Sequence, residues 1–85
     1  MKVFFSRHAM KRMAERGISL NEVYEVLRSP LDAIDVRFGR RAYVRHFADC
    51  YYVVVIAERR NQDLIVVTAI RTSRKGALRY GFIRI

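Results

Sequence analysis

Two uninterrupted apolar runs near the middle of the chain give its clearest pattern. Residues 53–56 read VVVI and residues 64–67 read LIVV. Continuous runs of β-branched and aliphatic residues are typical of strands that are buried on both faces. The pattern predicts four strands, at 31–38, 40–48, 51–58 and 63–70. The breaks between them are short enough for hairpins, so we expect an antiparallel meander.

The N-terminal third has the spacing of helices. After a short strand at 2–5, Ser6 is a suitable N-cap for a helix that runs from Arg7 to Arg16 and ends at Gly17. Ser19 and Glu22 have the spacing of a capping box, which predicts a second helix over Leu20–Arg28.

Helices that precede a run of strands predict an α+β fold. We expect two N-terminal helices packed on one face of a curved, mainly antiparallel sheet of four to six strands, in a single domain over 1–85. The tail, residues 72–85, holds Gly76 and Gly81 among apolar positions. It is either a last edge strand or an arm that docks elsewhere.

Charge adds a partner class to this picture. Seventeen Lys and Arg face eight Asp and Glu, for a net charge of +9, and fourteen of the seventeen are arginine. A guanidinium binds two phosphate oxygens at once and stacks on bases. The composition therefore predicts a polyanion, above all RNA or another nucleic acid, as partner, provided that the arginines gather on a shared surface.

The same counts exclude other classes of protein. One cysteine and two histidines allow neither an internal disulfide nor a zinc site, and we expect no metal and no cofactor. No apolar run approaches the roughly 18 residues that a membrane helix needs. The apolar stretch at the N-terminus is too short for a signal peptide, so we expect a cytoplasmic protein.

The strand at 40–48 alternates arginine with aromatic residues. Arg41, Tyr43, Arg45 and Phe47 share one face, and Ala42, Val44 and Ala48 share the other. Such a face suits single-stranded nucleic acid, because guanidiniums meet phosphates while rings stack on bases. The alternative is a solvated outer strand whose aromatic side chains pack under a loop or under the tail.

On the first helix, His8, Arg12 and Arg16 are spaced i, i+4, i+8 and form one stripe. A neutral imidazole flanked by guanidiniums is able to take a proton from a ribose hydroxyl while the arginines hold the phosphate. This is sufficient for metal-free RNA cleavage. The alternative is a solvated face on which Glu15 pairs with an arginine. Arg71, Thr72 and Arg74 belong to a basic, hydroxyl-bearing segment that is either a phosphate-binding loop or a flexible connector.

Residues 6–19, SRHAMKRMAERGIS, resemble the opening of small prokaryotic proteins in domain-of-unknown-function family 4258. The resemblance extends through residue 29 and, more loosely, to the hairpin at Gly39 and the late strand that ends at Thr72. Those proteins are similar to the RelE- and BrnT-like toxins. The resemblance implies a helical pair against a curved antiparallel sheet, a toxin-type ribonuclease activity, and a neutralising partner encoded alongside.

The resemblance also implies roles for residues. His8, Arg12 and Arg16 match polar residues of the family's first helix, and Arg71 and Thr72 lie at the strand end where the toxins place active-site groups. Three functions stay open. The first is a metal-independent endoribonuclease of the RelE/BrnT-like type, with His8, Arg12 and Arg71 as catalytic residues. The second is a non-catalytic nucleic-acid-binding module. The third is a basic domain that docks on an acidic antitoxin-like protein. A homodimer is also open.

Overall fold

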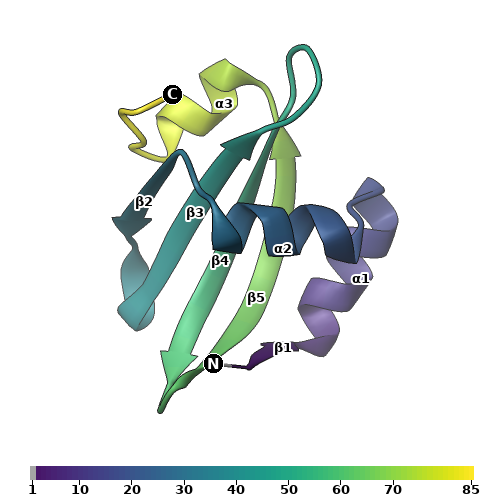
Figure 1. Cartoon of the computed structure of the whole chain (residues 1–85), viewed down its shortest axis with the longest axis vertical. Helices are drawn as coiled ribbons and strands as arrows, with labels where there is room; N and C mark the ends of the chain where they lie inside the picture. The colour runs from purple at the N-terminus through teal and green to yellow at the C-terminus, as the bar shows by residue number, and fades with distance from the viewer. Residues whose placement is uncertain (1) are drawn as a thin grey trace.

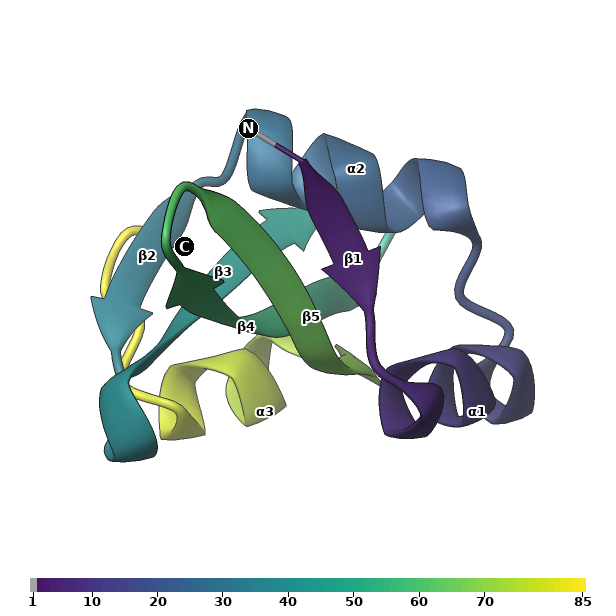
Figure 2. The same cartoon turned by 90° about the horizontal axis from the view of Figure 1, so that it is seen from below.

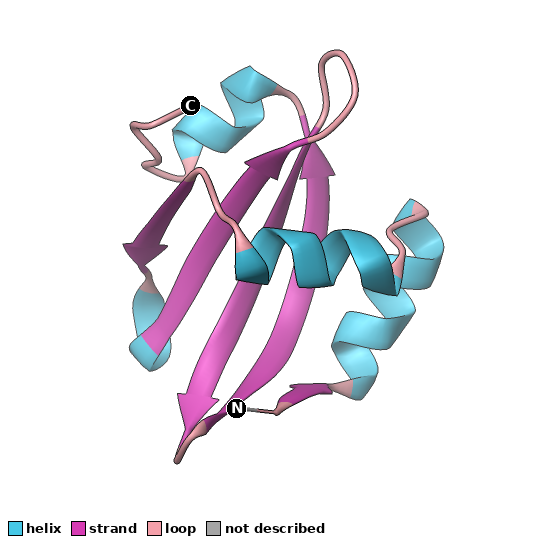
Figure 3. Cartoon of the chain, in the orientation of Figure 1, coloured by secondary structure: helices cyan, strands magenta, loops and turns pink. Residues whose placement is uncertain are grey.

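The computed structural model describes residues 2–85 and shows a five-stranded sheet with helices on both of its sides (Figure 1). The elements follow in the order β1 (Val3–Phe5), α1 (Arg7–Arg16), α2 (Leu20–Arg28), β2 (Asp32–Asp35), a 3-10 turn (Arg37–Gly39), β3 (Arg40–His46), β4 (Tyr52–Arg60), β5 (Asp63–Thr72) and α3 (Arg74–Arg79). The strand order is β1-β5-β4-β3-β2, and all neighbours are antiparallel except β1 and β5 (Figure 3). The expected α+β class is confirmed.

The first two helices begin and end where the sequence predicts. The hydroxyl of Ser6 accepts a hydrogen bond from the backbone N–H of Ala9, and Gly17 ends α1 in the left-handed conformation with a φ of 64°. Ser19 and Glu22 form both hydrogen bonds of a capping box at the start of α2. These signals are local, because each joins groups within one helical turn.

The two faces of the central strand β4 are buried under different elements. Val53 and Val55 lie in a cluster with Val23 and Val26 of α2. On the other face, Val54 lies in a cluster that includes the following residues of β3, β4, α3 and the tail: Ala42, Val44, Tyr52, Ala77 and Phe82. Figure 2 shows α2 on one side of the sheet and α3 on the other. The predicted burial of residues 53–56 on both faces is thus explained.

Helix α1 lies beside the edge of β5 and does not cross the middle of the sheet (Figure 2). The backbone N–H of Ser6 donates to Val66 O at 3.0 Å, and Arg16 Nη1 donates to Ala69 O at 2.8 Å. The bond from Ser6 continues the parallel ladder at the Phe5–Val66 pair, whereas the bond from Arg16 uses a carbonyl beyond the residues that pair with β1. Ala9 and Met13 of α1 nevertheless lie in the same core cluster as Val23 and Val26 of α2, so the expected packing of both helices on one face is confirmed.

Two expectations about strands are also corrected. The strand expected over 31–38 ends at Asp35, because the chain turns at Arg37–Gly39, where Phe38 and Gly39 have φ values of 63° and 68°. The tail is not an edge strand. It begins with α3, capped by the Ser73 hydroxyl, and it then inserts Phe82, which is 1% exposed, into the core. The tail is therefore an arm that docks on the sheet, which is the second of the two alternatives that the sequence leaves open.

A single carboxylate anchors this arm to the edge strand β2. Asp32 Oδ2 accepts backbone hydrogen bonds from Ile83 at 2.9 Å and from Arg84 at 3.2 Å. The hydrogen bond from Ile83 is the main reason that the pKa of Asp32 lies below its ordinary value, and the bonds from Arg84 and Ala33 add to it. Folding therefore favours the ionised form of Asp32.

We expect Asp32→Ala to release the tail and to lower the thermal midpoint of unfolding at pH 7. Because the pKa of Asp32 is lowered on folding, its contribution exists above about pH 4 and is lost as the pH falls through the folded-state pKa. At about pH 2 the variant and the wild type should differ far less. Asp35→Ala, which removes an exposed ion pair with Arg41 at the other end of β2, is the control. Equal midpoints for the wild type and Asp32→Ala at pH 7 would contradict this account.

Candidate functional site

The arginines of the sheet lie at the ends of the strands. Arg45, Val53 and Arg71 face one another in a row across β3, β4 and β5, at what we call the Arg71 end of the sheet. At the opposite end, which we call the hairpin end, lie Arg37, Arg40, Arg41, Arg59 and Arg60. The positive charge of the sheet is therefore divided between two ends, and the expectation of one shared surface is corrected.

The guanidinium of Arg71 lies over an aromatic ring. Its guanidinium carbon is 4.1 Å from the centroid of the Tyr51 ring, and Phe47 stacks on Tyr51 with ring centroids 5.9 Å apart and planes 15° apart. A Cβ atom at Gly17 would lie 3.6 Å from Arg71 Nη1, so the end of α1 borders the guanidinium. A cation in this position is held by the negative face of the ring.

The ring beneath Arg71 is itself held by α2. The hydroxyl of Tyr51 donates to Glu22 Oε2 at 2.7 Å, and the other oxygen, Oε1, accepts the backbone N–H of Ser19 at 2.9 Å. Partial burial raises the pKa of Glu22, but the hydrogen bonds from Ser19 and Tyr51, with the charge of Arg71, outweigh it and lower the pKa overall. The carboxylate that caps α2 therefore also orients Tyr51 and stays ionised at neutral pH.

This arrangement leaves the edge of Arg71 free for a ligand. Arg71 is exposed, and within residues 2–85 it has neither a hydrogen bond nor an ion pair of its side chain. The contact with the Tyr51 ring uses none of the N–H donors of the guanidinium, and these donors suit two oxygens of one phosphate. The site can hold an anion. Glu22, with its lowered pKa, is a weak base.

The structure does not bring the three predicted catalytic residues together. His8 is exposed near the start of α1, whereas Arg71 borders Gly17 at its end. Eight residues of helix separate His8 from Arg16, a rise of about 12 Å. Arg12, between them, forms an ion pair with Glu15 at 2.9 Å, as the alternative of a solvated face expects.

The predicted binding face of β3 is covered. Tyr43 and Phe47 are half-buried and pack against the cluster beneath the helices, so the expectation that both rings are open to bases is corrected. Arg45 Nη1 donates to Ser29 O at the end of α2, and Arg41 pairs with Asp35. Helix α2 is the cause for the two rings and for Arg45. The rings form part of the apolar surface that α2 needs beneath it, and Arg45 supplies a donor for its last carbonyls.

Thr72 and Arg74 belong to ordered structure. Thr72 is the last residue of β5, and the next residue, Ser73, caps α3. Arg74 Nε donates to the carbonyl oxygen of Ile85 at 2.9 Å, which ties the start of α3 to the end of the chain. The segment is neither a flexible connector nor an open phosphate-binding loop.

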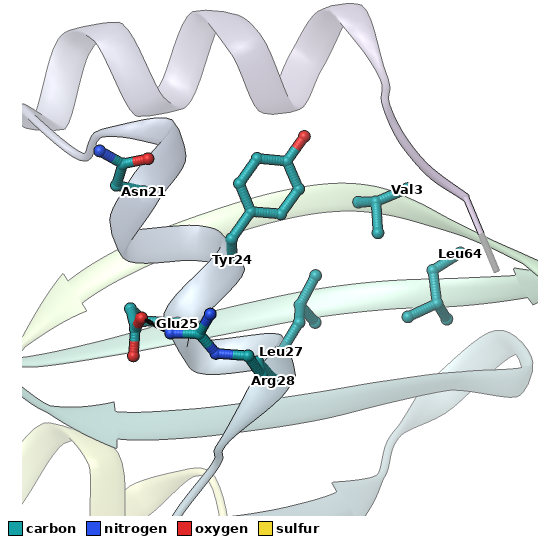
Figure 4. A pocket seen from close by; sticks show the side chains of 7 residues that line it. All are labelled: Val3, Asn21, Tyr24, Glu25, Leu27, Arg28 and Leu64. Carbon is teal, nitrogen blue, oxygen red and sulfur yellow. Dashed lines mark hydrogen bonds and ion pairs between the residues drawn. The ribbon is translucent and has the colours of Figure 1, made fainter.

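Apart from this site, a hollow lies between α2 and the β1–β5 edge (Figure 4). It is lined by Val3, Asn21, Tyr24, Glu25, Leu27, Arg28 and Leu64. Glu25 and Arg28 form an ion pair at its rim, and the exposed ring of Tyr24 stands over apolar side chains. Nothing in this hollow resembles an acid–base pair, and within residues 2–85 no three His, Cys, Asp or Glu side chains are grouped to hold a metal ion.

The sequence predicts that no helix of the chain is apolar enough to span a membrane. Among the residues that the structure describes, no helix combines the length and the apolar composition required to cross a membrane.

Comparisons with known proteins agree with the fold. The profile of the family described as Domain of unknown function (DUF4258) matches residues 5–71. No curated protein matches the chain. The crystal structure of the Brucella abortus ribonuclease toxin BrnT is similar, with a TM-score of 0.68 at 17% sequence identity, over 87% of this chain and 99% of that one. The likeness shows a common fold.

We expect Tyr51→Phe to uncouple the ring from α2 while leaving it beneath Arg71. Loss of the hydroxyl removes a hydrogen bond that lowers the pKa of Glu22, so this pKa should rise, as followed by an NMR titration of the carboxyl carbon. The free energy of unfolding in urea should fall by about 1 kcal/mol. Tyr24→Phe, which removes the hydroxyl of an exposed ring on α2, is the control. An unchanged pKa of Glu22 would show that the hydrogen bond is not formed in solution.

Proposed function

The chain belongs to the family described as Domain of unknown function (DUF4258), and we propose that it acts on RNA as a metal-independent endoribonuclease of the toxin type. The observation that carries the proposal is the exposed guanidinium of Arg71, which lies over the Tyr51 ring and has no other partner within residues 2–85. The fold shared with the BrnT ribonuclease toxin supports the proposal. An acidic antitoxin-like protein is the proposed protein partner, because its carboxylates would bind the same guanidinium.

The positions along α1 indicate how an RNA strand would lie. His8, Arg12 and Arg16 follow one stripe of the helix, and the stripe ends beside Gly17 and Arg71. In this proposal, the strand follows the stripe, and Arg71 holds a phosphate that flanks the one to be cleaved. A phosphate held this way fixes the position of the nucleotides on either side of it.

The reacting phosphate is placed near the start of α1 because proton transfer needs a group within hydrogen-bond reach. His8 takes the proton from the 2′-hydroxyl as the 2′-oxygen attacks phosphorus. The P–O5′ bond breaks, which leaves a 2′,3′-cyclic phosphate on one fragment and a 5′-hydroxyl, protonated by water, on the other. Arg12, one helical turn away, stabilises the charge on the phosphate oxygens when it exchanges Glu15 for the substrate. Arg71 is a binding residue in this scheme.

A non-catalytic RNA-binding module is the second candidate. It is favoured by the position of His8, which is exposed and which no hydrogen bond of residues 2–85 orients. Catalytic bases are usually oriented by a further side chain. Both candidates use Arg71 in the same way, so cleavage has to be tested apart from binding.

We expect Arg71→Ala to weaken binding of a single-stranded RNA oligonucleotide about tenfold, measured by fluorescence anisotropy in EDTA at low salt. The slope of log affinity against log salt should fall by about 0.7, because one phosphate contact is lost. Arg71→Lys keeps the charge but loses the stacked fork, so it should restore the salt slope and only part of the affinity. The control is Arg28→Ala, which removes one charge from the exposed face of α2. Equal losses from Arg71→Ala and Arg28→Ala would contradict a specific role for Arg71.

We expect the wild-type chain to cleave labelled RNA in EDTA and His8→Ala to lower the rate by about 100-fold or more with unchanged affinity. The reason is that only the proton transfer depends on the imidazole. RNA that is bound but never cut by the wild type would establish the second candidate. The absence of RNA binding at low salt would contradict both.

A further inference from the structure

The turn between β2 and β3 presents an aromatic ring in a strained position. Phe38 has a φ of 63° and a ψ of 32°, and its side chain is 81% exposed. A bulky residue at positive φ carries a steric cost that glycine does not. Packing does not offset this cost, because the ring lies largely in solvent. An exposed aromatic side chain on strained backbone is a feature that binding sites often have.

Phe38 shares a hollow of the surface with a second exposed ring. Tyr80, which follows α3 and is 38% exposed, lines one hollow together with Val36, Arg37, Phe38, Arg40 and Ile56. Phe38 and Tyr80 come from segments more than forty positions apart in the chain. The hollow thus combines two solvent-accessible rings with the apolar side chains of Val36 and Ile56.

Guanidiniums border this hollow. The guanidinium carbon of Arg40 is 5.8 Å from the centroid of the Phe38 ring, and Arg37 precedes Phe38 in the turn. At the hairpin end, Glu58 is shared by Arg40 at 3.4 Å and Arg60 at 2.7 Å, and Asp35 pairs with Arg41. Of these groups, only Arg37 and Arg40 line the hollow, and its lining holds no carboxylate, so the hollow favours an anionic occupant.

We propose that the hollow between Phe38 and Tyr80 binds single-stranded RNA, with a base on each ring and phosphates against Arg37 and Arg40. Single strands offer flat bases and phosphates in alternation, and aromatic side chains beside arginines bind them without sequence preference. The inference rests on the proposed action on RNA and extends it to a second contact at the opposite end of the sheet from Arg71. The hollow does not take part in cleavage.

The strain at Phe38 makes a sharp test possible. Phe38→Gly places at this position the residue that tolerates positive φ, so the thermal midpoint should stay equal or rise. The same variant lacks the ring, so its affinity for a single-stranded RNA of about 20 nucleotides, long enough to reach both sites, should fall about tenfold in EDTA. Higher stability with weaker binding separates a binding role from a structural one. Phe4→Ala, which removes a half-exposed ring at the opposite edge of the sheet, should bind like the wild type.

Fluorescence gives a direct readout. The chain contains no tryptophan, so Phe38→Trp introduces a single indole at the turn. Its emission should be quenched in a saturable manner by the RNA, and its affinity should match that of the wild type.

The outcomes separate this inference from the proposed function. Wild-type affinity in Phe38→Gly, with Arg71→Ala still impaired, overturns the inference and leaves the proposed function standing. The absence of RNA binding by the wild type at low salt overturns both. A Phe38→Trp emission that RNA does not change also overturns the inference.

Discussion

Both faces of β4 and β5 are apolar, and a chain of 85 residues has to cover them both. Burial of these side chains is the dominant favourable term in folding, so every other element is placed where it excludes water from one face or the other. Helix α2 covers Val53 and Val55, and the tail covers Val54 through Ala77 and Phe82. Helix α1 lies beside β5, where Ser6 and Arg16 bind carbonyls of its outer edge.

This covering determines where charge can lie. An unpaired guanidinium cannot be buried at an acceptable cost, so the arginines of the sheet lie at the ends of the strands, where helices no longer cover them. At one end, the carboxylate that caps α2 also holds Tyr51, and Tyr51 supports Arg71. At the other end, the turn at Phe38 and the tail at Tyr80 place two rings beside arginines. One requirement of the core thus produces two separate cationic surfaces, each with aromatic rings beside its arginines.

The parts of the fold that depend on local signals could be predicted from the sequence, and the parts that depend on distant contacts could not. Ser6, Gly17 and the Ser19–Glu22 pair act within one turn of helix, and both helices have the predicted bounds. The helical start of the tail was not predicted, because burial of Phe82 depends on a sheet face formed by other strands. Arg71 was a predicted site residue, but the partners that orient it were not, since Tyr51 and Glu22 are 29 positions apart. Likewise, the alternation in β3 gives two faces without telling which of them α2 covers.

The most direct test of the account observes the guanidinium itself. In ¹⁵N-edited NMR spectra, the Nε–Hε signals of the arginines are followed while a single-stranded RNA oligonucleotide is added in EDTA at low salt. The account predicts that the Arg71 signal shifts early and strongly, and that the signal of Arg28, which pairs with a carboxylate on its own helix, shifts less. RNA binding that leaves the Arg71 signal unchanged would contradict the account.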